Sequence, residues 1–332
     1  MRCSFQFDVC VCGDCKGDVN MDKRWFCWSK KCRIDPTLII ALVKQWRLET
    51  HTFHLSWGEC TITLKDVALH LGIRVDDRVV TGPSFLHWDE LCDELLREVP
   101  PKNARKGAAL KMTWLLSILC APLSEEPTIH QLQCRCRAYI MYMIDDSLIP
   151  DKSGNRVHLM YLNLLHDLNN IKKYSWDSTC LANLYKELCR ASSEVGRVMS
   201  VMGLVPHAFY CTKSPHKELL ISSTWIGGRL EYRVTPHDDL VPYRGFEEHL
   251  PRHVYRDREI WSACTAIICF PIVEWHQTNR VKLQFGLQQH IPIDSVNLDR
   301  FHQIDMQDNH YSDWMKYHTE WINIWKTKAM MF

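Results

Sequence analysis

The sequence is poor in residues that break regular structure, and it has almost no net charge. Its 332 residues include 13 glycines and 14 prolines. That is below the roughly 12% that these two residues contribute to an average protein, which excludes a collagen-like or low-complexity chain. The formal net charge of +1 lacks the strong basic character that marks many nucleic-acid-binding domains. Direct nucleic-acid contact is therefore not supported by net charge, although a local basic face is compatible with it.

Long hydrophobic runs are also lacking. The longest nearly apolar stretch is Ala263–Val273, whereas a membrane-spanning helix needs about 20 residues. We interpret this stretch as part of a buried helix over residues 259–276. The first residues contain no apolar run of signal-peptide length. We therefore expect a protein with no membrane partner that is not secreted, and whose cysteines are mostly reduced.

Cysteine and tryptophan, in contrast, are abundant, with 16 and 13 residues. Six of the cysteines fall within residues 1–33, which we interpret as a poorly ordered extension preceding one domain over residues 34–328. Two cysteine pairs in this extension have spacings that could hold zinc in a tetrahedral site: Cys12, Cys15, Cys27 and Cys32. The second pair is spaced more loosely than usual and Cys10 competes for the register, so an unstructured Cys-rich leader is the alternative.

Apolar periodicity predicts a mainly α (α+β) class: a single helical domain with a small antiparallel β-hairpin near residues 51–64. Pro36 would open the first helix, and a helix after Ser175 would bury leucines and expose Asp177. The tryptophans of the last helix share one side and indicate core packing. The predicted helices cover residues 36–46, 66–71, 87–97, 112–120, 128–148, 157–168, 176–190, 259–276 and 312–328. Cysteines in apolar patterns should pack as small hydrophobic side chains: Cys60, Cys180, Cys189, Cys264 and Cys269.

The hairpin is the best-defined local element of the sequence. Period-two alternation on both sides of Ser56–Glu59 predicts a four-residue loop, with Leu55 opposite Cys60 and Phe53 opposite Ile62. One face should be buried, and the other, with Thr52, His54, Thr61 and Thr63, should be wet. Alternation sends His51 and His54 to opposite faces, so these two and Glu59 should not form a metal triad but act as hydrogen-bonded structural residues.

The residues from His51 to Glu59, followed by Thr61–Val67, resemble the plant mobile domain family. Further matches occur in the same order along residues 34–328, including Val80–Gly82, Asp151–Asn155 and Val281–Gln289. Residues 203–241 depart from the family pattern, as an insertion or a misread gene boundary would produce. The resemblance nominates these motif and interaction residues: His51, Thr52, His54, Trp57, Gly58, Glu59, Thr61, Thr63, Asp66, Asp151, Lys152, Ser153, Gly154 and Asn155.

The resemblance implies a non-enzymatic, transposon-derived protein that acts in the nucleus, otherwise in the cytoplasm. Its partners would be unknown nuclear proteins or chromatin, its roles meristem maintenance and silencing of mobile elements, and it would need no cofactor. The family also carries aminotransferase-like and phosphatase labels. A pyridoxal enzyme needs a Schiff-base lysine on a phosphate-binding scaffold, and the turn around Lys152 has no such scaffold. The Gly-Asp pairs at 13–14 and 17–18 lack the His-Gly that a metallophosphatase would add.

A second hypothesis is a metal-dependent hydrolase or nuclease that uses Asp145, Asp146 and Asp151. Adjacent residues on an α-helix project about 100° apart. Asp145 and Asp146 would therefore share a metal ion poorly unless the helix ends there.

Overall fold

The structure is a computed structural model. It describes residues 36–56, 58–71, 75, 78–149, 155–193, 221–226, 229–234, 252–296, 298, 301, 304 and 313–327. Helices predominate and the sheets are small and antiparallel, which confirms the predicted class. The α-helices are α1 (Pro36–Gln45), α2 (Leu64–Leu71), α3 (Trp88–Leu96), α4 (Met112–Cys120), α5 (Ile129–Met143), α6 (Met160–Leu164), α7 (Trp176–Ser193), α10 (Arg252–Tyr255), α12 (Trp314–Tyr317) and α13 (Thr319–Thr327).

The strands form four separate sheets in the described part of the chain. They are β1 (Trp46–Arg47), β2 (Thr52–Leu55) and β3 (Gly58–Cys60); β4 (Arg105–Lys106), β5 (Ala109–Lys111) and β6 (Arg156–His158); β7 (Ile221–Ile226) and β8 (Arg229–Val234); and β9 (Thr265–Cys269) and β10 (Ile272–His276). A π-helical segment, Ile144–Leu148, extends α5, and short 3-10 helices cover Leu168–Lys173, Arg258–Ile260, Thr278–Arg280 and Lys282–Phe285.

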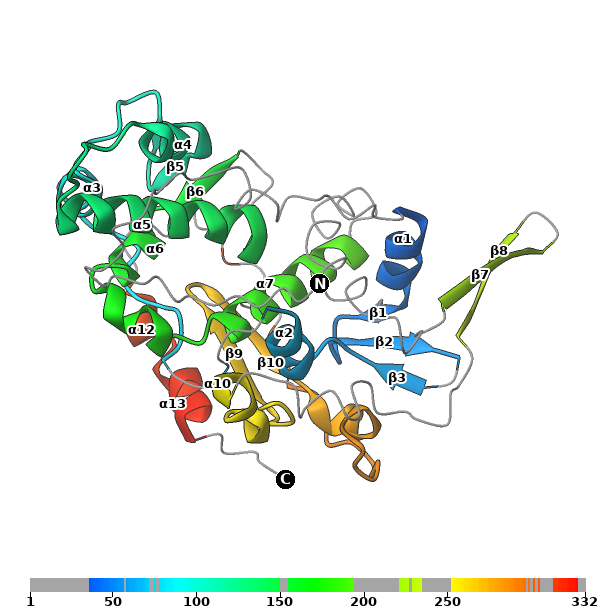
Figure 1. Cartoon of the computed structure of the whole chain (residues 1–332). Coiled ribbons are helices and arrows are strands. Elements are labelled where there is room, and N and C mark those ends of the chain that lie inside the picture. The colour runs from blue at the N-terminus through cyan, green and yellow to red at the C-terminus, as the bar shows by residue number, and fades with distance from the viewer. Residues whose placement is uncertain are drawn as a thin grey trace.

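Helix α7 lies at the centre of the fold, between the β9–β10 hairpin and α2, with β1 near its end (Figure 1). The predicted leucine stripe, Leu181, Leu184 and Leu188, is buried as expected. Asp177 was predicted on the solvent face, and that prediction is wrong, because it is fully buried. Ser175 precedes the helix as predicted, but its hydroxyl donates to the carbonyl of Val75.

The predicted helix over residues 259–276 is wrong: the structure has the β9–β10 hairpin there. All ten strand residues are buried, so no period-two alternation marks them. A short apolar run cannot be assigned to helix or strand by periodicity alone. Its β-branched residues favour strands, and Phe270, with φ of 49°, and Pro271 form the connection between Cys269 and Ile272.

Two further elements differ from the sequence prediction. Residues 157–168 are not one helix but β6 followed by the short α6. β6 pairs with β5, and β5 with β4. These strands are too short to show a sustained period-two alternation, so this sheet was not predicted. The C-terminal helix is interrupted at His318. Of the predicted inner side of this helix, Trp314, His318 and Trp325 are buried and Trp321 is half-buried.

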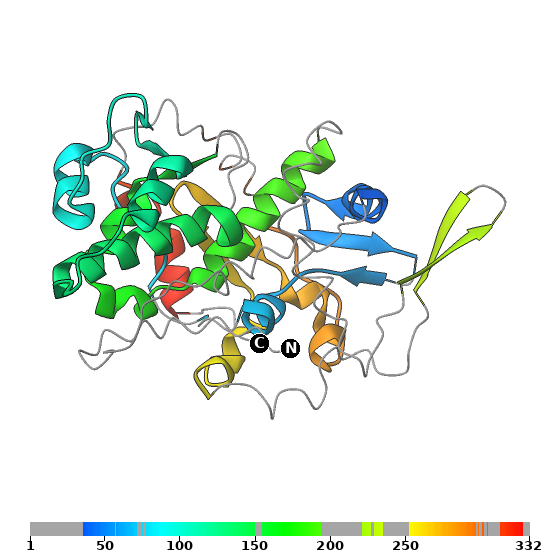
Figure 2. The ribbon, with the colours of Figure 1, turned by 45° about the horizontal axis from the view of Figure 1, so that its top comes forward.

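The Val80–Gly82 motif links distant parts of the fold. The carbonyl of Val80 accepts a hydrogen bond from the amide of Phe270 at 2.9 Å, and the carbonyl of Gly82 accepts one from Trp314 at 3.2 Å. The segment therefore joins the β9–β10 hairpin to α12. Turned by 45°, the molecule keeps the C-terminal helices beside β9 and far from the β2–β3 hairpin (Figure 2).

Candidate functional site

The β2–β3 hairpin carries most of the motif residues, and its register differs from the prediction. Phe53 pairs with Cys60, and Leu55 with Gly58. The loop therefore has two residues instead of four, and Gly58 begins β3 with φ of 140°, which other residues rarely adopt. The observed register thus differs from the predicted one by two residues. Because two is an even number, the strand side chains stay on the faces predicted for them.

The predicted wet face of the hairpin is largely buried, so that prediction is wrong. Thr52, Thr61 and Thr63 are each at most 5% exposed, and His54 is half-buried. β3 ends at Cys60, so Thr61 and Thr63 lie in the connection to α2 rather than on a strand. The residues that cover this face come from Val281–Gln289 and its neighbours, far away in sequence, and local alternation cannot predict them.

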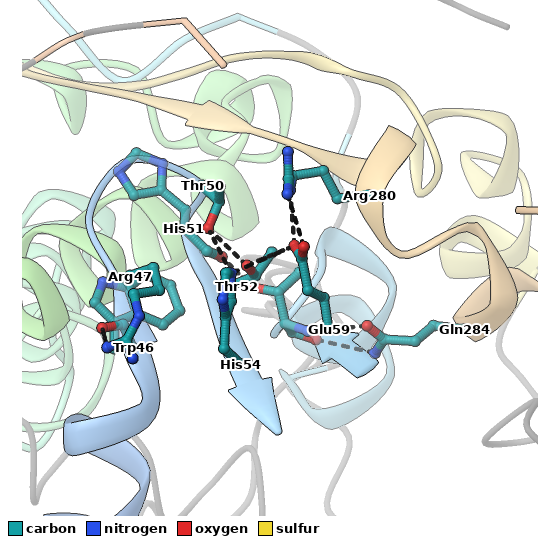
Figure 3. Close-up of polar contacts among 10 residues, drawn as sticks. Trp46, Arg47, Thr50, His51, Thr52, His54, Glu59, Arg280 and Gln284 are labelled. Atoms are coloured by element: carbon teal, nitrogen blue, oxygen red, sulfur yellow. Dashed lines mark hydrogen bonds and ion pairs between the residues drawn. The ribbon is translucent and has the colours of Figure 1, made fainter. Parts of the chain in front are cut away.

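Glu59 and Arg280 form the main ionic contact of this covered face (Figure 3). Both guanidinium contacts, from Nε and Nη2, measure 2.7 Å, a bidentate geometry that is stronger than a single hydrogen bond. Thr52 donates to the same carboxylate at 2.9 Å. The hydrogen bonds from Arg280 hold the pKa of Glu59 below its usual value, against the effect of burial.

Gln284 fixes the chain that leaves β3. Its side-chain oxygen accepts from the amide of Thr61 at 2.9 Å, and its side-chain nitrogen donates to the carbonyl of Thr61 at 3.0 Å (Figure 3). The Gln284 side chain thus satisfies both backbone groups of Thr61, as the backbone of a neighbouring strand would do. His54 lies 3.7 Å from Glu59 and 3.4 Å from the hydroxyl of Thr50, at the open side of the cluster.

His51 faces the opposite direction from His54, into the core, as the alternation predicted. Its Nε2 lies 3.2 Å from the carboxylate of Glu274, which is fully buried, and its Nδ1 lies 3.0 Å from the carbonyl of Trp275. Its ring contacts Tyr185, with centroids 5.2 Å apart. His51 has φ of 50°, an uncommon backbone conformation for a residue other than glycine, which these contacts hold in place.

His276 continues this buried polar layer. Its Nδ1 lies 3.0 Å from the carbonyl of Ala263, and its Nε2 accepts from the amide of Leu64 at 3.4 Å. These partners fit a neutral ring with the proton on Nδ1. Burial lowers the pKa of His276 to about 4. Tyr185 adds a 2.6 Å hydrogen bond to the carbonyl of Ile62.

Asp66 and Thr63 begin α2. The amide and the hydroxyl of Thr63 both donate to the Asp66 carboxylate at 2.7 Å, and the amide of Asp66 lies 3.4 Å from the Thr63 hydroxyl. This reciprocal arrangement is a capping box, which satisfies amides that a helix start leaves unpaired. The role of both motif residues in this structure is therefore to start a helix.

Several predicted site residues lie outside the described part of the chain: Cys12, Cys15, Cys27, Cys32, Trp57, Asp151, Lys152, Ser153 and Gly154. Asn155 is described, is exposed, has φ of 52°, and its carbonyl accepts from the amide of Met112 at 3.0 Å. Asp145 is buried in the π-helical segment, whereas the Asp146 side chain lies outside the described part of the structure. Among the described residues, no three His, Cys, Asp or Glu side chains lie together as a metal site.

The described cysteines are all thiols. The sequence prediction that they pack as small hydrophobic residues is confirmed for Cys180, Cys189, Cys264 and Cys269, which are buried, while Cys60 is half-buried. Burial raises the pKa of Cys60 and of Cys269 to about 12. At neutral pH these two thiols are protonated and poorly nucleophilic.

Three residues that shape this site are not among the predicted site residues: Arg280, Glu274 and His276. Each lies in or next to a segment that was interpreted as a buried helix. Their signal was the charged and polar character of Glu274–Arg280 directly after an apolar run, since such groups enter a core only when they have partners.

A comparison with family profiles decides what kind of domain this is. The profile described as Plant mobile domain matches residues 25–218 and 229–331. The chain belongs to the plant mobile domain family. The match includes Cys27 and Cys32. Of residues 203–241, which the sequence predicts to depart from the family pattern, only residues 219–228 are left unmatched.

Curated relatives of this plant mobile domain chain come from Arabidopsis thaliana. It is 32% identical to "Serine/threonine-protein phosphatase 7 long form homolog" over 90% of this chain and 25% of that protein. It is 30% identical to "Protein MAIN-LIKE 1" and 28% identical to "Protein MAINTENANCE OF MERISTEMS", covering 84% and 81% of this chain and 60% of each relative. The chain thus spans between a quarter and three fifths of the length of these relatives. No solved structure matches, and no helix in the described residues has the length and apolarity to cross a membrane.

Proposed function

We propose that this chain is a non-enzymatic, transposon-derived module that binds nuclear proteins or chromatin and acts in the silencing of mobile elements. The observation that carries the proposal is that the ionisable motif residues of the hairpin are occupied within the fold. Glu59 is held by Arg280, and Asp66 caps α2. Carboxylates held in this way are poorly placed to transfer protons or to bind a metal ion. The names of the relatives support a link to meristem maintenance.

We propose neither an aminotransferase nor a phosphatase activity for this chain. The phosphatase name belongs to a relative of which this chain covers a quarter. A fold alone does not define an activity, which depends on a site with suitable groups. The described residues offer a layer of structural hydrogen bonds, so we propose that the module needs no cofactor.

A segment exchange tests the proposal. This chain would replace the matching segment of Protein MAINTENANCE OF MERISTEMS in Arabidopsis plants that lack the protein, with a fluorescent tag. We expect nuclear fluorescence, recovery of the root meristem and lower transcript levels of mobile elements. A chimera that accumulates to normal levels and enters the nucleus, but restores neither phenotype, would contradict the proposed role. Cytoplasmic fluorescence would contradict the location.

The alternative is a metal-dependent hydrolase or nuclease. It draws on the position of Asp145 in a π-helical segment, Ile144–Leu148, because π-helical turns often occur at functional sites. A thermal melt with and without Mg²⁺ or Mn²⁺ separates the two hypotheses, since a ligand that binds the folded state raises its melting temperature. A clear shift that Asp145→Ala abolishes would favour the enzyme. The interaction module predicts no such shift.

A further inference from the structure

The outer face of the β4–β5–β6 sheet is strongly basic. Lys106 pairs with Ala109, Ala109 with His158, and Lys111 with Arg156. Cross-strand partners lie on the same face, and so do residues two positions apart on one strand. These five residues therefore share one face, while Leu110 and Val157 point into the core and are buried. The sheet lies beside α4, away from the β2–β3 hairpin (Figure 1).

This face places like charges directly across from each other. Lys111 and Arg156 are neighbours across two strands, with Cβ atoms about 5 Å apart in this geometry. Like charges directly opposite each other are destabilising, whereas opposite charges are favourable. Here residues 99–124 contain no Asp or Glu, and neither Lys106, Lys111 nor Arg156 has an ion-pair partner among the described residues.

Arg156 is held in place on this face. One of its terminal nitrogens lies 3.3 Å from the carbonyl of Ala109 and 3.5 Å from that of Ala104. A guanidinium has five N–H donors, and the described residues provide partners for only this nitrogen. The neighbouring Arg105 differs, since it points to the other side of the sheet, where it forms a 3.0 Å ion pair with Asp89. Among the described residues, Arg105 thus has an acidic partner, whereas the three cations of the outer face have none.

From these observations we infer that the outer face of the β4–β5–β6 sheet, through Lys106, Lys111 and Arg156, binds the phosphate backbone of a nucleic-acid duplex. The inference rests on the proposed function, which it deepens by naming a chemical class of partner. A protein partner would usually meet an apolar centre with aromatic side chains, and the only apolar residue on this face is Ala109. Nucleic-acid interfaces are more polar and more positive. The strands carry no Phe, Tyr or Trp on which single-stranded bases could stack, which favours a duplex.

Contacts to phosphates alone give modest, sequence-independent and salt-sensitive binding. A net charge of +1 is compatible with it, because the local arrangement of charge, not the total, determines the field at one face. Removing two of the three cations should therefore weaken the binding severalfold and make it less sensitive to salt.

The test uses fluorescence anisotropy of a labelled DNA duplex of about 20 base pairs with the full chain at low salt. We expect binding by the wild type. The double variant Lys106→Gln/Lys111→Gln should weaken it at least about fivefold and reduce the slope of log K against log salt by about 2. The matched control is Lys44→Gln/Lys326→Gln, which removes the same charge from exposed lysines on α1 and α13. It should change the affinity less than about twofold, and thermal melts should show both variants folded.

Three results would overturn the inference: no duplex binding by the wild type, equal weakening by both variant pairs, or tighter binding of a polyglutamate peptide than of the duplex with the same dependence on Lys106 and Lys111. The last result would indicate an acidic protein partner. A failure of this inference can be distinguished from a failure of the proposed function, because a chimera that carries the lysine substitutions tests silencing in plants directly. Restored silencing without duplex binding would reject this inference alone.

Discussion

Two buried polar regions of this domain differ sharply. Around the β2–β3 hairpin, His51, Glu59 and His276 have partners from distant parts of the chain, such as Glu274, Arg280 and Leu64. At the start of α7, Asp177 is fully buried, and neither carboxylate oxygen has a hydrogen-bond partner among the described residues. Burial of polar groups therefore does not mark stabilisation or function by itself, and what matters is whether the partners are present.

The largest expected effect is at the core side of the hairpin. His51→Ala removes the contacts to Glu274 and Trp275 and leaves a fully buried carboxylate with one partner fewer. Removing one member of a buried pair costs about 3–5 kcal/mol, and we expect about 3 kcal/mol because Glu274 keeps other interactions. Urea denaturation measures it. The control is His54→Ala at the half-buried side, with an expected loss of less than about 1 kcal/mol. Equal losses would show that the two faces do not differ.

A smaller effect is expected at the outer side of the hairpin. Arg280→Ala breaks both 2.7 Å contacts to Glu59. The pair is partly exposed, with 19% and 24% of the side-chain surfaces accessible, so solvent screens the loss and we expect about 2 kcal/mol. Arg190→Ala is the control. It removes a more exposed arginine, with 44% of its side chain accessible, that makes one contact to Glu187 within α7, and it should cost less than about 1 kcal/mol. If the two variants lose the same stability, the hairpin pair is an ordinary surface ion pair.

The sequence predicts contacts between residues that are close along the chain better than contacts between residues that are far apart along it. Local patterns were enough for α3, α4, α5 and the direction of His51, because periodicity and caps act within a few residues. They failed for β9–β10, whose strands are buried on both faces and show no alternation. They also failed for the covered face of the hairpin, since Arg280 lies 221 residues from Glu59. For Asp177, helical spacing placed the residue opposite the leucines, but β9–β10 and the segment with Asp257 enclose α7 on more than one side.

The smallest expected effect is a gain in stability rather than a loss, and it concerns Asp177 at the start of α7. Burial, together with the nearby carboxylate of Asp257, raises the pKa of Asp177 well above its usual value. The folded state therefore binds a proton more tightly than the unfolded state does. Stability then falls as the pH rises from about 4 through the raised pKa, and it stays reduced above that value. Asp177→Asn removes this slope, and we expect it to stabilise the fold by about 1 kcal/mol at pH 8 and by much less at pH 4.

The test is the free energy of unfolding of the wild type and of Asp177→Asn measured as a function of pH, rather than one melting temperature. His276 has a lowered pKa, so its contribution falls as the pH drops below about 6.5, but it is present in both proteins and cancels in their difference. Asp167→Asn is the matched control. It makes the same chemical change at an exposed helix cap, where Oδ1 accepts from the amide of Asn169 at 2.9 Å, and it should change the stability by less than about 0.5 kcal/mol because Asn caps a helix about as well as Asp. If Asp177→Asn destabilises the fold equally at pH 4 and pH 8, the carboxylate has a partner that offsets its burial. The start of α7 would then resemble the hairpin instead of contrasting with it.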